Sequence, residues 1–72
     1  MDERYVLICS TNGILVALGT GSKDEMDKYS ENLKSITDKV GVKLYIEKVD
    51  KESEHKILNS IKYITDKYSY LV

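Results

Sequence analysis

The chain is 72 residues long, and its 11 basic and 12 acidic side chains leave a net charge of −1. A charge this close to zero provides no overall field that would hold nucleic acid or an anionic membrane surface. The single cysteine and the single histidine exclude an internal disulfide and a Cys/His metal cluster. We therefore expect one domain over residues 1–72, with no cofactor and no metal, near the size limit at which a chain folds alone.

The sequence lacks the patterns that are typical of export or membrane insertion. Its first residues, MDERY, are charged where a signal peptide needs a basic region and then a long apolar region. The longest apolar run, Ile14 to Leu18, is far too short to cross a bilayer. We expect a cytoplasmic protein that has no membrane partner.

A β-hairpin is predicted over residues 5–21, YVLICSTNGILVALGTG. Asn12-Gly13 lies between two apolar runs, and both residues tolerate the positive φ that a type I′ turn requires. The turn sets a register that pairs Leu7 with Leu18 and Val6 with Gly19. Both faces of this hairpin are apolar. The bulkier face carries Tyr5, Leu7, Cys9, Ile14, Val16 and Leu18, and the slimmer face carries Val6, Ile8, Leu15 and Ala17.

The first helix is predicted to begin after Ser22 and to end before Gly41. Ser22 and Glu25 have the spacing of a capping box, and glycine adopts the left-handed conformation that ends many helices. Apolar residues recur between these ends at spacings of three and four, which predicts one buried stripe. The stripe consists of Met26, Tyr29, Leu33, Ile36 and Val40.

A third strand and a second helix follow. Apolar and polar residues alternate from Val42 to Glu47, the period of a strand with one buried face. Asp50 can cap a helix that extends to about Tyr70. The predicted core face of this helix consists of Ile57, Leu58, Ile61, Ile64 and Tyr68.

Together these elements predict an α+β, two-layer ββαβα fold. A right-handed crossover makes the third strand parallel to the second, in a three-stranded mixed sheet of order 2-1-3. We expect both helices on one face, which leaves the other face open as an interface, because uncovered apolar patches usually mark one. The alternative, with helices on opposite faces, needs no partner to cover the hairpin. The predicted interface residues are Val6, Ile8, Leu15, Ala17 and Tyr45, and the choice between the slimmer and the bulkier face of the hairpin as the open one is left undecided by the sequence.

No motif in the sequence predicts catalysis. The turn Gly19-Thr20-Gly21-Ser22-Lys23 resembles a phosphate-binding loop, but it lacks a third glycine and the P-loop spacing. Acidic residues directly after the turn would also repel an anion, so a helix cap is the favoured interpretation. Cys9 falls in a strand and His55 in the second helix, which favours a packed thiol over a nucleophile. We expect no enzyme activity.

Two surface patterns are candidate partner sites. Asp24, Asp27, Glu31 and Asp38 lie on one side of the first helix, although neighbouring lysines dilute the charge and a solvated face is the simpler interpretation. Tyr63 and Tyr70 project from the second helix near Lys56 and Lys67. Tyrosines with basic neighbours suit a protein interface or the stacking of single-stranded bases.

These observations favour a small, non-enzymatic protein–protein interaction module. We expect a homodimer that regulates or inhibits a host or partner protein, of the kind that phages and mobile elements encode. The first alternative is nucleic-acid binding through the tyrosines and lysines of the second helix, which the near-neutral charge disfavours. The second alternative is a phosphate or nucleotide at residues 19–23.

Overall fold

A computed structural model describes residues 3–71, so Met1, Asp2 and Val72 lie outside the described part of the chain. Within that part, three strands and three α-helices are followed by a short 3-10 turn. The elements are β1 (Arg4–Thr11), β2 (Ile14–Gly21), α1 (Lys23–Val40), β3 (Lys43–Val49), α2 (Lys51–Asn59), α3 (Ile61–Lys67) and η1 (Ser69–Leu71).

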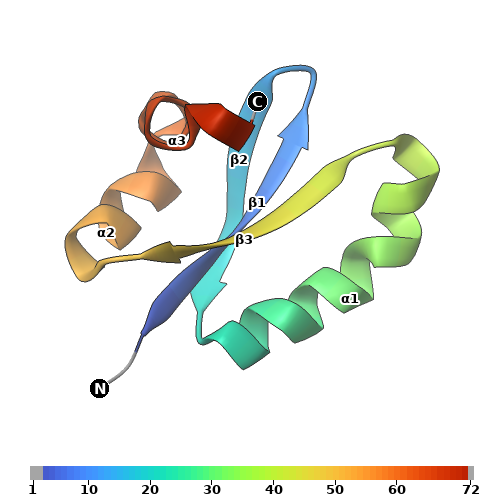
Figure 1. The fold of residues 1–72 in the computed structure, drawn as a ribbon, viewed down its shortest axis with the longest axis horizontal. Helices are drawn as coiled ribbons and strands as arrows, with labels where there is room; N and C mark the ends of the chain where they lie inside the picture. Colours follow the sequence, from blue (N-terminus) through green and yellow to red (C-terminus); the bar gives the residue numbers. More distant parts are fainter. Residues whose placement is uncertain (1–2, 72) are drawn as a thin grey trace.

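The three strands form one open sheet in the order β2-β1-β3 (Figure 1). The α+β class and the strand order 2-1-3 are confirmed. The sheet is not mixed, because β1 lies between the other two strands and pairs antiparallel with both. β2 and β3 run in the same direction but are not neighbours, so every hydrogen-bonded strand pair is antiparallel.

The hairpin turn forms at Asn12 and Gly13, whose φ angles are 52° and 78°. The predicted register holds from the turn as far as the pair Ile8 and Ala17. Beyond that pair it is wrong, because a β-bulge at Leu18 places Gly19, not Leu18, opposite Leu7.

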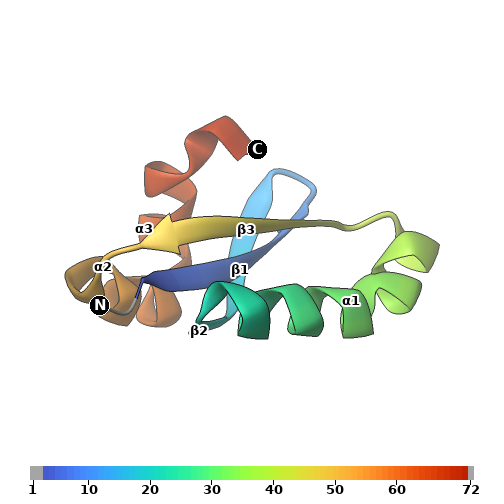
Figure 2. The same cartoon turned by 60° about the horizontal axis from the view of Figure 1, so that its bottom comes forward.

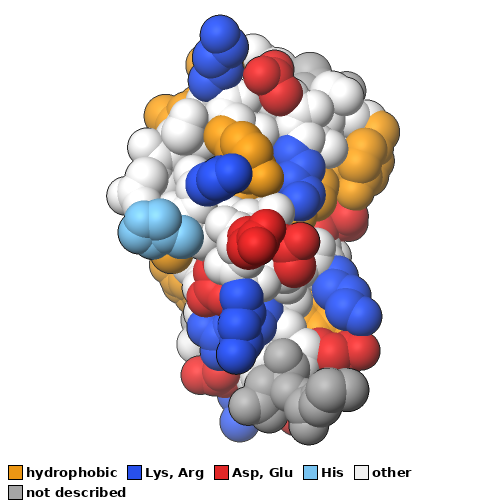
Figure 3. All heavy atoms as spheres, turned by 90° about the vertical axis from the view of Figure 1, so that its left-hand side faces the viewer, with side chains coloured by type: hydrophobic (Ala, Val, Ile, Leu, Met, Phe, Trp, Pro, Cys, Tyr) orange, Lys and Arg blue, Asp and Glu red, His pale blue; other side chains and the backbone are white. Residues whose placement is uncertain are grey.

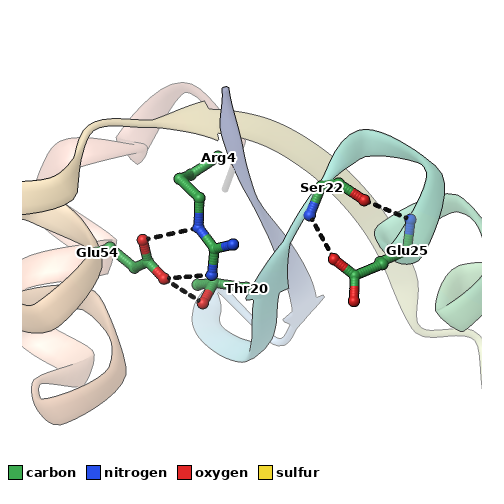
Figure 4. Close-up of polar contacts among 5 residues, drawn as sticks. All are labelled: Arg4, Thr20, Ser22, Glu25 and Glu54. Atoms are coloured by element: carbon green, nitrogen blue, oxygen red, sulfur yellow. Dashed lines mark hydrogen bonds and ion pairs between the residues drawn. The ribbon is translucent and has the colours of Figure 1, made fainter. Parts of the chain in front are cut away.

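Both ends of α1 are where the sequence predicts them. The Ser22 hydroxyl accepts from the Glu25 amide at 3.2 Å, and the Ser22 amide donates to the Glu25 carboxylate at 3.0 Å (Figure 4). Gly41 ends the helix with a left-handed φ of 72°. The capping box and the C-terminal glycine therefore fix the length of α1.

The predicted second helix is in fact two helices, α2 and α3, because the chain is extended at Ser60, with φ −148° and ψ 113°. The Ser60 hydroxyl accepts from the Tyr63 amide at 3.2 Å and so caps α3. The prediction of one continuous core stripe is wrong in part. Leu58 and Ile61 flank the break and are more than half exposed.

The helices lie on opposite faces of the sheet, which contradicts the prediction of a shared face (Figures 1 and 2). Val6 and Ile8 of β1 belong to a core cluster with residues of α2 and α3. Leu7, between them, is also fully buried and must point to the other face. α1 covers that face, where the Tyr29 ring lies against Gly19, the partner of Leu7 in β2.

A buried tyrosine and a charged network hold the α2–α3 side in place. Arg4 donates to both carboxylate oxygens of Glu54 at 2.8 and 3.2 Å, and Thr20 donates to the same carboxylate at 2.7 Å (Figure 4). The hydrogen bonds from Arg4 hold the pKa of Glu54 below its ordinary value. Tyr68 is 3% exposed and donates to the Lys48 carbonyl at 3.2 Å. Burial raises the pKa of Tyr68 to about 12.

The raised pKa of Tyr68 predicts a loss of stability at high pH. The unfolded chain releases this proton near pH 10, whereas the folded chain keeps it, so the free energy of unfolding falls as the pH rises from about 10 to about 12. We expect this group to account for a fall of roughly 2–3 kcal/mol. Urea unfolding of the wild type and of Tyr68→Phe across this range measures it. A Tyr68→Phe variant whose stability falls as steeply as that of the wild type would contradict the assignment.

Candidate interaction surfaces

The interface predicted from the sequence is part of the core. Val6, Ile8 and Leu15 are fully buried beneath α2 and α3, and Ala17 and Tyr45 are half-buried against the same cluster. The prediction of an open face at these residues is therefore wrong. The error follows from placing both helices on one side, since α2 and α3 cover the face that was expected to be bare.

The less completely covered face lies under α1. Met26 is buried at the start of this helix, but Ile36 and Val40 at its other end are 60% and 66% exposed. Tyr29 is also exposed, and so is Ile14, which belongs to the same face of the sheet because it pairs with Thr11. We refer to Ile14, Tyr29, Ile36 and Val40 as the α1 apolar surface. The prediction of one buried stripe along α1 is therefore wrong in part, because Met26 is the one residue of the stripe that is buried.

A groove of about 640 Å³ runs between α1 and β3. Figure 2 shows α1 extending alongside this strand. Five consecutive residues, 42–46, line the groove on the strand side. Because successive strand residues point to opposite faces, a lining of consecutive residues means that the groove follows the outer edge of β3.

The predicted acidic stripe divides between two places. Asp27, Glu31 and Asp38 line the groove beside β3, whereas Asp24 lies in a separate hollow beside Glu3 and Tyr5. Two lysines, Lys34 and Lys43, line the same groove. Asp27 is also paired with Lys23 at 3.1 Å. The groove is therefore polar with charges of both signs, and the acids do not form a field of one sign.

The two tyrosines predicted to form a partner surface lie on different elements and have different partners. Tyr63, in α3, is half-buried and donates to the Ser53 hydroxyl at 3.1 Å. The ammonium groups of Lys56 and Lys67 lie 5.8 and 6.0 Å from the centre of its ring. Ser53, a buried hydroxyl that also accepts from Lys67 at 2.7 Å, was missed, because no sequence signal marks a polar residue as part of a core.

Tyr70, in η1, is exposed and donates to the Glu47 carboxylate. Its ring meets that of Tyr68 edge-on, with 6.1 Å between the ring centres. Figure 3 shows the side of the molecule nearest α2, where basic and acidic side chains are intermixed. Among the described residues drawn there, the intermixed charges do not suit a nucleic-acid backbone.

The glycine turn is arranged as a helix cap. Gly19 and Gly21 belong to β2, and the amide of Ser22 already donates to the Glu25 carboxylate. This hydrogen bond lowers the pKa of Glu25, so the carboxylate is ionised at neutral pH. The Glu25 carboxylate therefore already occupies the Ser22 amide that a bound phosphate would need.

Cys9 and His55 are separated by the sheet. Cys9 pairs with Val16 and Leu44 on the face that α1 covers, and His55 is exposed on α2, which covers the other face. Within residues 3–71, no group of three or more His, Cys, Asp and Glu side chains is arranged to hold a metal ion. In the same part of the chain, no helix combines the length and apolar character that crossing a membrane requires.

Comparisons of the chain with protein-family models, with curated proteins and with solved structures found no match. The geometry of the chain's own surfaces is consequently the basis for assigning a function.

The difference between the two sides of the sheet predicts different effects for two isoleucines. Ile64 is fully buried in α3, so Ile64→Ala should lower the free energy of unfolding by about 2–5 kcal/mol. Ile36 is exposed in α1, so Ile36→Ala should change it by less than about 1 kcal/mol. Urea unfolding at low protein concentration compares them. Equal losses would mean that the end of α1 is packed as tightly as α3.

Proposed function

We propose that this chain is a non-enzymatic protein–protein interaction module, homodimeric, which regulates or inhibits a partner protein by binding it. The observation that carries this proposal is the α1 apolar surface. Large apolar side chains remain exposed at the end of α1 and at the start of β2, whereas Val6, Ile8 and Leu15 on the opposite face of the sheet are fully buried. Contiguous exposed apolar surface is characteristic of protein interfaces.

The chemistry of this surface suits a protein partner. Isoleucine, valine and tyrosine offer area that a partner can bury, at about 25 cal/mol per Å² of apolar surface removed from water. Tyr29 adds a ring with a polar end, the type of side chain that interface cores favour. The polar groove lies along another side of the same helix, so an apolar centre would have charged groups beside it. This is the usual anatomy of an interface.

Nucleic-acid binding ranks below protein binding. Lys67, beside Tyr63, donates to Ser53, so part of the predicted tyrosine and lysine surface is engaged within the chain. The net charge of −1 also provides little attraction for phosphates. A regulatory or inhibitory role is one that a small chain with an exposed apolar surface can perform by binding alone.

The proposal is tested by capturing partners from an extract of the native host on the immobilised chain. We compare the wild type with Ile36→Lys, which places a charge in the α1 apolar surface. The matched control is Leu58→Lys, because Leu58 is a helical residue of similar exposure, 51%, on the other side of the sheet.

The expected result is one protein that the wild type and Leu58→Lys retain equally and that Ile36→Lys loses at least tenfold, since a buried unpaired charge opposes binding. Circular dichroism and melting temperature establish that both variants are folded. If Ile36→Lys retains the same proteins as the wild type, the α1 apolar surface is not the binding site.

A further inference from the structure

β3 presents an outer edge that is regular and available for pairing. It lies at one border of the sheet, and its register with β1 is continuous over seven residue pairs. β2, at the other border, is interrupted by the bulge at Leu18. Bulges twist an edge away from further pairing, whereas a flat, regular edge can accept another strand. β3 is therefore the edge that is suited to association.

The sequence of β3 is complementary to itself. Its first five residues read Lys-Leu-Tyr-Ile-Glu, so the order of residue types reverses about Tyr45. When two such strands run antiparallel about a two-fold axis at Tyr45, Lys43 lies opposite the partner's Glu47. Leu44 then lies opposite the partner's Ile46, and the two Tyr45 rings face each other. Opposite charges and apolar or aromatic pairs directly across two strands stabilise a sheet.

We propose that a second copy of this chain pairs along β3 in this register, which joins the two sheets into one antiparallel sheet of six strands. The inference deepens the proposed function, because it rests on the homodimer and assigns its interface. Two-fold symmetry makes each cross-strand pair away from the axis occur twice, so the Lys43–Glu47 pair contributes two ion pairs to the interface.

Other registers do not match the side chains. A two-fold axis perpendicular to the sheet places the equivalent faces of the two copies on the same side. Each alternative register therefore pairs a given residue with a partner residue two positions along the strand. One shift sets Leu44 against the partner's Lys48, and the other sets Lys43 against the partner's Tyr45. Only the register centred on Tyr45 matches charge with charge and apolar with apolar.

The helices fit this arrangement. α1 contacts all three strands and lies mainly over β3 and β1. With strands spaced about 4.8 Å apart, two α1 helices related by the axis would lie about 10 Å apart, close to the usual 8–10 Å of packed helices. The groove beside β3 would be filled by the second copy. Ile36 lies at least about 100° around α1 from every helical residue that lines the groove, so Ile36 stays available to a partner.

The experiment is a charge reversal measured by sedimentation velocity over a range of micromolar concentrations. Lys43→Glu and Glu47→Lys each place like charges opposite each other twice in the proposed dimer. A mixture of the two variants, in contrast, matches every Glu with a Lys in the heterodimer. Tyr70→Phe is the control for loss of the hydrogen bond that Tyr70 donates to Glu47.

The wild type and Tyr70→Phe should be dimers, each single variant should dissociate at least about tenfold more readily, and the mixture should recover the wild-type affinity. A wild-type dimer that neither reversal weakens would overturn the β3 interface but not the homodimer. Weakened single variants that the mixture does not restore would overturn the register. A wild-type monomer would overturn both the interface and the homodimer, while partner capture through the α1 apolar surface is measured separately.

Discussion

The structure depends on one constraint, which is that β1 must be covered on both faces. Val6, Leu7 and Ile8 are consecutive and completely buried, and consecutive strand residues point in opposite directions. A single layer of helices cannot bury all three. The chain therefore places α1 on one face and the α2–α3 pair on the other, and the core is built from two halves that share the central strand (Figure 1).

The two halves are unequal, and this inequality is the basis of the functional argument. The α2–α3 half is closed by Ile57, Ile64 and Tyr68 and is tied to the strands through the ion pair of Arg4 with Glu54. The α1 half is well packed only near the start of the helix. The α1 apolar surface and the outer edge of β3 thus both border α1, whereas the exposed Leu58 and Ile61 of the other half flank the break between its helices. A second copy would cover the edge of β3 there, and a partner protein would cover the α1 apolar surface.

Local signals in the sequence predicted local structure well. Asn12-Gly13, Ser22 with Glu25, and Gly41 define the turn and the helix ends because each acts through its own backbone geometry or a neighbouring amide. The bulge at Leu18 has no local sequence signal, whereas the break at Ser60 has one that was missed, because Ser60 caps α3 through the nearby Tyr63 amide. The side of the sheet that each helix occupies also depends on tertiary packing. For this reason Val6 and Ile8, which belong to the core, were predicted to form an interface.

Amide hydrogen exchange at low and high protein concentration tests most directly the claim that the chain associates through its incompletely covered side. Backbone amides at an unpaired strand edge exchange readily, and pairing with a second copy protects them. The account predicts that protection in β3 rises with concentration while protection in α2 and α3 stays constant. Exchange in β3 that is independent of concentration, or protection that rises instead in α2 and α3, would contradict it.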